Sequence, residues 1–547
     1  MRTFSPRELR RRRGCSRRHP VRTAAAGGVL VVVLLSGLHL EQYTGVPAAG
    51  EDCAIRAHLV TATGPGAPTA VPKWKHVERY PRWLTQVRGT VDDASCLNAT
   101  PVYGVARPTS ITEVREALRF ARANDLSVVS SGTRHAMGGQ NAALGALVLD
   151  MRDMAAVRID TTRKTATVAA GALWRDVLEA AHADGLAVTA MPSIDTLSVG
   201  GTLSVNAHGA DFRVGSLAST VRSLTLVTAD GSVHHLSRTR EAELFRAVVG
   251  GYGLFGVIID AELDLVPNRM YELRQTIVTT DDLPTYLQER VFPDPTARLA
   301  YAHLSTSPGS LLEEAIVYTH HDVANYQATE PMPLLRAEQN SRVGRLVLNL
   351  ARHGGLAQRA KWRMQRDLLP HVRPCHEPRN EALRAGEACL VSRNQAMYND
   401  LGLLRNNMTS YTDVLHEYFL PPEQLRSFLA AARTSLRRHD AQLLNASVRV
   451  VHDNDVLLDY ARGDRLSVVL YLSQKVSADG NADMADLTHE LLDAALKRGG
   501  TFYLPYQQHY TREQVARAYP MLREFFALKE RYDPGRRFRN SFYDRYA

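Results

Sequence analysis

Two glycine-rich loops most constrain how this 547-residue chain can fold. Residues 130–140 are SSGTRHAMGGQ, and residues 192–211 are PSIDTLSVGGTLSVNAHGAD. Both loops follow an apolar stretch, and each holds one conspicuous histidine. Backbone with small side chains lets amide N–H groups converge on an anion, and glycine supplies the positive φ that such turns require. Two such loops in one half of a chain predict a long ligand that contains a pyrophosphate.

The basic character of the chain is concentrated in its first residues. The net charge is +9, but residues 1–23 hold nine arginines against the single acid Glu8, which leaves the remaining residues at about +1. A hydrophobic content of 45% and a charged content of 22% are ordinary for a globular enzyme. A chain of this length predicts two or more domains. Because the chain beyond the basic arm is nearly neutral, no nucleic-acid partner is expected.

An apolar run, Ala24–Leu38, follows the basic arm. A membrane span needs about 20 residues, and a signal-peptide core has about 7–15. Two interpretations stay open: a signal peptide cleaved after Val46-Pro47-Ala48, or an uncleaved anchor helix over about residues 21–40. Arginine before the run and Glu41 after it orient the N-terminus toward the cytoplasm. We therefore expect a membrane-anchored or exported protein whose folded body lies outside the cytoplasm.

Five cysteines are present, and Cys15 belongs to the arm. The other four would lie in an oxidising compartment, where two disulfides can form, and Cys53–Cys96 with Cys375–Cys389 is the economical pairing. Because no pair has C-x-x-C spacing, no metal site is expected.

The first half of the chain mixes short hairpins with isolated helices. Ser110 and Glu113 predict the N-terminus of a helix over residues 111–124. Asp230-Gly231 predicts a hairpin between strands at 223–228 and 233–236. The other expected elements are strands at 126–129, 146–149, 157–159, 165–169 and 257–266, and helices at 173–185 and 242–249. This mixture favours α+β layers over regular βαβ winding.

The second half predicts a sheet with one face buried under helices. Strands are expected at 411–420, 447–451 and 466–472, with covering helices at 422–438 and 482–497 and a final helix at 513–529. Residues 342–369 are basic and amphipathic. Two interpretations of this segment remain: a helical cover over the active site, or a surface that docks to anionic lipid.

The motif Gly251-Tyr252-Gly253-Leu254-Phe255-Gly256 matches G-x-G-x-x-G. In a nicotinamide-binding domain these glycines follow a strand and open a helix. Here the expected order is reversed, with a helix before and a strand after, so we exclude a Rossmann site.

Several segments together resemble one family. VDDASCLNATPVYGVARPTS resembles its first strand, GTRHAMGGQ and VGGTLSVNAHGAD its two FAD loops, and GGYGLFGVIIDAELDLV the strand that closes its FAD domain. The stretch from about Val91 to Pro267 thus resembles the FAD-binding domain of the vanillyl-alcohol oxidase / p-cresol methylhydroxylase flavoprotein superfamily. Within it the chain is most similar to the aldonolactone and alditol oxidase branch. The C-terminal segment YPMLREFFALKERYDPGRRFRNSFYDRY resembles the ending of that branch.

The resemblance implies a fold and a division of the chain. The fold is α+β, with a two-subdomain FAD-binding domain of the p-cresol methylhydroxylase type and an antiparallel-sheet substrate domain covered by helices. The expected divisions are the arm and signal or anchor (1–50), an N-terminal extension (51–98), the FAD domain (99–270), the substrate domain (271–505) and a segment returning to the FAD domain (506–547).

The resemblance also implies which residues hold FAD. The first loop would wrap the pyrophosphate, and His135 stands where many members attach the flavin covalently; the alternative is that His135 is only a polar neighbour of the phosphates. The second loop would follow the ribityl chain and pyrophosphate, and the closing strand would contact the adenine side. The expected contacts are Ser131, Gly132, Thr133, Arg134, His135, Ala136, Ser193, Gly200, Gly201, Asn206, His208, Gly209, and Val257 or Ile258.

The reaction that the family implies is oxidation of a C–OH carbon by hydride transfer to the flavin. Such chemistry needs a base for the hydroxyl proton and a positive or donating group that stabilises the reduced flavin. Glu417 matches the glutamate of the family's Glu-Tyr strand, and Arg449 matches an arginine on the strand expected beside it, so a Glu417–Arg449 pair is predicted. His509 lies near the family's His- and Lys-containing substrate motif, but YLPYQQHY lacks the lysine and offers Tyr503, Tyr506 and Gln507.

Three functions follow from these features. The first is an FAD enzyme that oxidises an alcohol of a sugar-like lactone, an alditol or another hydroxylated small molecule, with oxygen as acceptor. The second is a dehydrogenase that passes electrons to a membrane quinone or a protein. The third is a flavin-binding subunit without turnover. The substrate, the acceptor and the oligomeric state stay undetermined by the sequence.

Overall fold

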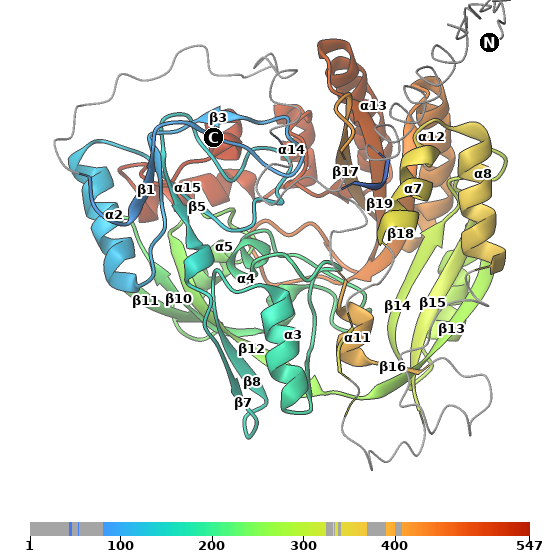
Figure 1. The fold of residues 1–547 in the computed structure, drawn as a ribbon, viewed down its shortest axis with the longest axis horizontal. Coiled ribbons are helices and arrows are strands. Elements are labelled where there is room, and N and C mark those ends of the chain that lie inside the picture. The colour runs from blue at the N-terminus through green and yellow to red at the C-terminus, as the bar shows by residue number, and fades with distance from the viewer. Residues whose placement is uncertain are drawn as a thin grey trace, which may run out of the picture.

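The computed structural model describes residues 43–45, 53, 80–323, 332, 334–336, 341–368, 390–399 and 407–547 (Figure 1). The basic arm, the expected anchor over residues 21–40, Cys15, Cys375 and Cys389 lie outside these residues. Within the described part of the chain, no helix combines the length and the apolar character that a membrane span requires. The predicted disulfide between Cys53 and Cys96 is confirmed.

The first sheet joins β1 (Leu84–Val87), β4 (Gly104–Ala106), β6 (Leu147–Asp150) and β5 (Val128–Ser131), in that order. Its last three strands are parallel, and β1 is antiparallel to β4. Helix α2 (Ile111–Ala123) packs an apolar stripe against the sheet, and its N-cap Ser110 accepts the predicted hydrogen bond from the Glu113 amide. Beside the sheet lies a small hairpin of β2 (Thr90–Val91) and β3 (Thr100–Pro101). Because β5 ends at Ser131, the first glycine-rich loop starts at the carboxyl end of a parallel strand.

The second sheet is antiparallel and carries the second glycine-rich loop. Its order is β11 (Val233–Ser237), β10 (Val221–Val227), β12 (Val257–Pro267), β8 (Thr165–Ala169) and β7 (Val157–Asp160), and β9 (Leu186–Val188) pairs with the end of β12. Its helices are α3 (Trp174–Ala183), α4 (Val199–Ser204) and α5 (Ala242–Val248). The rejected G-x-G-x-x-G motif lies between α5 and β12, so a helix precedes it and a strand follows it, as expected.

Among the residues that the structure describes, the third sheet has eight antiparallel strands. Their order is β16 (Leu390–Ser392), β13 (Met270–Thr279), β15 (Glu314–Asp322), β14 (Ala297–Leu304), β18 (Gln442–Val451), β19 (Arg465–Lys475), β17 (Tyr411–Leu420) and β20 (Thr501–Phe502). Strand β17 has the predicted bounds, whereas β18 starts five residues earlier than predicted. The sequence did not predict β13, β14 or β15.

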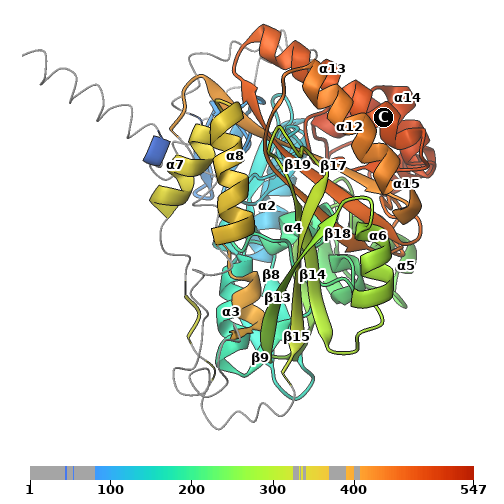
Figure 2. The same ribbon diagram turned by 90° about the vertical axis from the view of Figure 1, so that its right-hand side faces the viewer.

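Helices cover both faces of this sheet (Figure 2). On one face lie α12 (Leu425–Arg438) and α13 (Ala478–Leu496), where Phe428 contacts Tyr418 and Thr488 contacts His416. On the other face lie α7 (Ser341–Ala351) and α8 (Gly355–Arg363), where Leu348 packs on Tyr471 and Trp362 packs on Tyr318. The shorter helices of this part are α6 (Leu283–Tyr286) and α11 (Arg393–Met397).

The C-terminal segment crosses back to the first sheet. It forms α14 (Arg512–Ala518), α15 (Leu522–Tyr532) and α16 (Ser541–Tyr546), and Phe538 makes a parallel bridge to Val128. The single helix predicted over residues 513–529 is wrong: Pro520 lacks an amide hydrogen and disfavours helical backbone at the preceding residue, so two helices form.

The expected α+β class is confirmed. Two small sheets carry the two glycine-rich loops, and a larger antiparallel sheet covered by helices stands beside them (Figure 1).

Candidate functional site

The two glycine-rich loops meet at Ser198. The Thr133 amide donates to Ser198 Oγ at 3.4 Å, and the Ser198 amide donates to Thr133 Oγ1 at 3.3 Å. Gly132 permits this approach, because a Cβ at that position would lie 1.9 Å from Ser198 Oγ. Ser198 is also the N-cap of α4, so it joins the end of β5 to the start of that helix.

The rest of the first loop is held from several directions. Arg134 has a positive φ of 60°, and its guanidinium lies 3.4 Å from Asp150. His135 Nδ1 lies 3.2 Å from Thr133 Oγ1. The side chains of His135 and Ala136 are half-buried, and the next amide, that of Met137, donates to Pro505 O at 2.7 Å. The segment that follows the last strand of the third sheet therefore supports this loop, in addition to the loop's contacts within its own part of the chain.

The second loop is packed so closely that several positions exclude a side chain. A Cβ at Gly209 would lie 2.0 Å from the Met191 carbonyl oxygen, and one at Gly200 would lie 2.7 Å from Ala170 Cβ. Asn206, with φ of 48°, accepts from the Ala218 amide through Oδ1 at 2.9 Å. Of the other predicted residues, Gly201 lies beside Ser198 and Ser193 is half-buried at the start of the loop.

His208 joins the second loop to the third sheet. Its Nε2 lies 2.6 Å from Glu417 Oε1, and both side chains are at most 3% exposed. Ser467 Oγ donates to the same oxygen at 2.5 Å, and Tyr506 OH donates to Oε2 at 3.1 Å. Burial by itself raises the pKa of Glu417, but the charge and hydrogen bond of His208, the field of Arg449 and the Ser467 hydrogen bond together hold this pKa below its ordinary value. Glu417 is therefore a carboxylate at neutral pH.

Aromatic side chains surround His208. Its ring centroid lies 5.7 Å from that of Phe419, 5.9 Å from Tyr460 and 6.1 Å from Tyr503. Both tyrosines also bind the loop backbone. Tyr460 OH donates to Asn206 O and Tyr503 OH donates to Val205 O, each at 2.8 Å. Side chains on β17 and in the segments next to β19 and β20 thus fix the second loop at Asn206 and His208, which the sequence assigns to FAD.

The predicted Glu417–Arg449 pair is not formed. Strand β19 lies between β17 and β18, so Arg449 stands opposite Ser467 and not beside Glu417. Among the described residues, the ion-pair partner of Glu417 is His208. Arg449 acts on Glu417 only through its longer-range field, and its side chain is half-buried on the same face of the sheet.

His509 does not join Glu417 either. Its Nδ1 lies 3.3 Å from Thr488 Oγ1 on α13, and the same hydroxyl lies 3.4 Å from His416 Nε2. Because neighbouring residues of a strand point to opposite faces, His416 and Glu417 lie on opposite faces of β17. The imidazole of His509 is therefore on the α13 side of the sheet, away from the glycine-rich loops, and Tyr506 of the same segment reaches Glu417 instead.

Val257 and Ile258 open strand β12 beside the first loop's strand. Val257 belongs to the apolar cluster that contains Val128 of β5, and it pairs with Val227, while Ile258 pairs with Leu226. Both side chains are buried. Their backbone therefore lies at the junction of the two smaller sheets, below the first loop.

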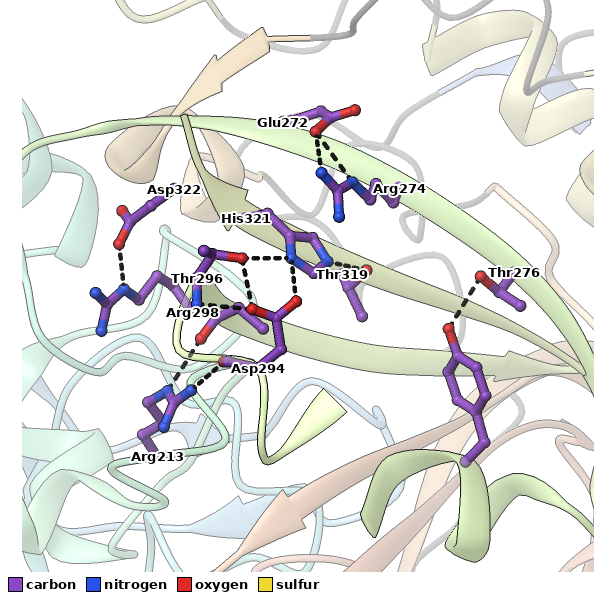
Figure 3. A network of polar contacts seen from close by, with 12 residues as sticks. Arg213, Glu272, Arg274, Thr276, Asp294, Thr296, Arg298, Thr319, His321 and Asp322 are labelled. Carbon is purple, nitrogen blue, oxygen red and sulfur yellow. Dashed lines mark hydrogen bonds and ion pairs between the residues drawn. The ribbon is translucent and has the colours of Figure 1, made fainter. Parts of the chain in front are cut away.

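Two arginine contacts fix the end of the second loop to the third sheet's domain. Arg393 of α11 is buried and donates to Asp211 Oδ2 at 2.6 Å and to Val188 O at 3.0 Å. Arg213 donates to Asp294 O at 2.6 Å and to Ala297 O at 3.0 Å. Figure 3 shows Arg213 reaching the start of β14, where Asp294 contacts His321. The C-terminal end of the loop is thus held against the part of the chain that forms the third sheet.

The residues of both loops fit FAD. Among the described residues, five buried polar atoms on the loops have no hydrogen-bond partner: Ser131 Oγ, Arg134 Nε, Thr196 Oγ1, Asn206 Nδ2 and His208 Nδ1. Buried polar groups are normally paired, so these atoms call for a polar ligand that spans both loops. The pyrophosphate, ribityl and ring polar groups of FAD supply such partners.

Comparison with known proteins identifies this arrangement. Residues 102–237 match the family described as FAD binding domain. The chain is 36% identical over 172 residues to cytokinin dehydrogenase 2 of Arabidopsis thaliana, covering 30% of this chain and 34% of that protein. It is 31% identical over 170 residues to L-gulonolactone oxidase of Bos taurus, covering 31% and 38%. It is also 37% identical over 175 residues to an uncharacterised oxidoreductase of the fasciation locus of Rhodococcoides fascians, covering 32% and 40%.

A solved structure extends the likeness of the fold. The 6-hydroxy-D-nicotine oxidase of Arthrobacter nicotinovorans superimposes with a TM-score of 0.54 at 19% identity, covering 80% of this chain and 91% of that one. The aligned region spans two fifths or less of the length of the curated relatives named above. Residues 102–237 of the chain therefore match an FAD-binding domain, as the resemblance implied, and FAD is its cofactor.

Three important residues escaped the sequence prediction. Ser198 joins the loops, Ser467 binds Glu417, and Tyr506, noted only as a replacement in the substrate motif, reaches the same carboxylate. Ser467 carries no sequence signal because its role depends on the register of β19 against β17. Ser198 could have been noticed as a helix N-cap immediately before Val199-Gly200-Gly201.

Proposed function

We propose that this protein is an FAD-dependent oxidoreductase that oxidises a C–OH group of a sugar-like lactone, an alditol or another hydroxylated small molecule. The observation that carries the proposal is the buried carboxylate of Glu417, which His208 holds at 2.6 Å against the second FAD loop. A base at this position is what removal of a hydroxyl proton requires. L-gulonolactone oxidase is among the similar proteins and acts, as its name says, on a lactone.

The residues have distinct tasks in this proposal. Bound FAD supplies the hydride acceptor. Glu417 takes the hydroxyl proton at Oε2, where Tyr506 already donates, while His208 and Ser467 hold Oε1 and fix the carboxylate's orientation. Arg449, half-buried on the same sheet face, contributes positive charge toward substrate and reduced cofactor. His135, beside Thr133 in the first loop, is the proposed point of covalent attachment of the flavin.

Anaerobic reduction tests the activity. Purified holoprotein is mixed without oxygen with lactones, alditols, sugars and lipid-linked alcohols, and with a cytokinin as an amine donor, while flavin absorbance is followed. Bleaching by a hydroxylated compound supports the proposal. Bleaching by the cytokinin alone overturns its C–OH specificity, and bleaching by none of them supports a flavin-binding subunit without turnover.

The electron acceptor is either oxygen or a membrane acceptor. A membrane quinone or a protein partner is supported by the contact of Tyr43 with Asn349 of α7, since Tyr43 follows the predicted anchor by a few residues. Admitting air to the bleached protein separates the two: rapid return of the yellow colour indicates an oxidase, and return only with a quinone indicates a dehydrogenase. The Cys53–Cys96 disulfide supports a location of the folded body outside the cytoplasm.

Acid precipitation tests the attachment at His135. The wild-type protein should give a yellow pellet after denaturation in acid, because a covalent bond survives unfolding. His135→Ala should give a colourless pellet and a yellow supernatant while keeping its FAD before denaturation. A colourless wild-type pellet contradicts the covalent bond.

A further inference from the structure

The outer surface of α7 and α8 combines apolar and basic side chains. Leu350 is 43% exposed and Leu356 is 79% exposed, and Arg342, Arg359 and Arg363 are exposed beside them. Residues 341–368 contain six arginines and one lysine against the single acid Asp367, and of these basic side chains Arg345, Arg352 and Lys361 are buried. Exposed leucines among arginines are the composition of a helix that lies at a membrane interface. The inner surface of the same helices packs on the third sheet.

The segment that follows the apolar run is bound to the same helix. Asn349 Nδ2 donates to Tyr43 O at 2.8 Å, and Arg345 Nε donates to Thr44 O at 2.8 Å. Tyr43 OH also lies 2.5 Å from His353 Nε2. Figure 2 shows this short segment beside α7. The side chains of Asn349 and Arg345 are buried, so removal of residues 43–45 would leave buried donors without these acceptors. The contact therefore favours an N-terminus that stays on the protein.

The contact also limits the distance between α7 and a membrane. If the anchor ends near Leu40, two residues lie between it and Tyr43. The three residue-to-residue steps from Leu40 to Tyr43 can span at most about 11 Å. An anchor over residues 21–40 thus places the outer surface of α7 and α8 next to the lipid headgroups. Anionic lipids attract the arginines there, and the leucines can enter the interface.

We propose that Arg342, Leu350, Leu356, Arg359 and Arg363 form a docking surface that rests on an anionic bilayer, next to the point where the chain enters it. The proposal rests on the membrane association in the proposed function and does not depend on the C–OH activity. It orients the molecule, because α7 and α8 lie on the Glu417 face of the third sheet. That face would then be reached from the membrane side.

Fluorescence quenching by brominated lipid tests the docking surface. The full chain carries Leu356→Trp, or Met521→Trp as control. Met521 is 42% exposed and directly precedes α15, which lies across the molecule from α8 (Figures 1 and 2). Each variant is reconstituted as one copy per nanodisc of phosphatidylcholine with about 30% phosphatidylglycerol. Flavin absorbance equal to wild type confirms that each variant has folded.

The tryptophan added at position 356 should lose about half or more of its fluorescence in brominated discs, and the one at position 521 should lose none. Adding Arg359→Gln and Arg363→Gln should reduce the quenching at position 356. Equal, weak quenching at both positions overturns the proposal. So does a change at position 356 that appears in detergent and grows with protein concentration, because it would show a second copy on this surface.

Discussion

Glycine at single positions decides whether the FAD loops can form. A Cβ at Gly209 would meet the Met191 carbonyl oxygen at 2.0 Å, and a backbone oxygen cannot rotate away. The neighbour of Gly209 is His208, the residue that joins the loop to Glu417. The composition of the loop predicted a close backbone approach, but only the structure identifies which atoms approach.

Gly209→Ala should therefore lower the flavin content of the purified protein. Overpacking of this kind costs about 1–3 kcal/mol, which corresponds to about five- to 150-fold weaker retention of the loop conformation. The flavin-to-protein absorbance ratio measures it. Gly309→Ala is the matched control, because a Cβ there meets nothing within 4 Å. Equal flavin content in both variants would contradict this account of the loop.

His509 and His416 form a buried pair whose neutral state the fold enforces. Burial, with the charge of Arg545 and of His489, lowers the pKa of His509 to about 4. Burial and His509 lower that of His416 to about 3. In the unfolded chain both titrate near pH 6.5, so the unfolded state binds more protons between pH 6.5 and about 4. Their contribution to stability is complete above pH 6.5 and is lost as the pH falls.

His509→Gln should flatten the pH dependence of the free energy of unfolding between pH 6.5 and 4. Urea unfolding at several pH values measures this slope. The rate of flavin reduction per bound flavin should change little, because the imidazole lies on the far side of β17 from Glu417. An unchanged slope together with a large loss of that rate would restore the catalytic role that the sequence assigned to His509.

At the scale of helices and strands, the sequence correctly predicted those features that depend on residues close together in the chain. The Ser110 cap marked the start of α2 correctly, because a cap leaves a direct pattern in the sequence. Strand β17 has the predicted bounds, but the expectation of a sheet with one buried face was wrong, because helices cover both faces and nearly all residues of β17 are buried. Strand β15 was missed because nearly all of its residues are buried, which removes the alternation that marks a strand. The Glu417–Arg449 pair did not form, and His509 lies on the far face from Glu417, for a related reason: strand order and side-chain face are set by tertiary pairing, which no local pattern records.

The contact of α11 with the second loop makes a quantitative prediction. Arg393 is buried against Asp211, so Arg393→Met leaves an unpaired buried carboxylate and should lower the free energy of unfolding by about 3–5 kcal/mol. Arg222 and Asp264 form a comparable pair at the surface, with side chains 41% and 38% exposed. Arg222→Met should cost about 1 kcal/mol or less. Denaturant unfolding compares the two, and equal losses would contradict the anchoring role of Arg393.

At the scale of the whole molecule, the site exists only because distant segments converge. The FAD loops belong to the first 211 residues, Glu417 and Ser467 come from the third sheet, and Tyr506 precedes the C-terminal return to β5. The sequence predicted the cofactor because its loops are contiguous. It predicted Glu417 through a strand motif, but not the His208 partner, because their contact spans more than 200 residues.

The most direct test of the central claim is the rate of flavin reduction in Glu417→Gln. Wild type and variant are mixed anaerobically, in a stopped-flow instrument, with the hydroxylated compound that bleaches the wild type. Glutamine keeps the shape of the side chain but cannot take a proton, so reduction should slow by about 10²–10⁴-fold, with flavin content unchanged. A variant that reduces its flavin within about threefold of the wild-type rate would contradict the assignment of Glu417 as the base.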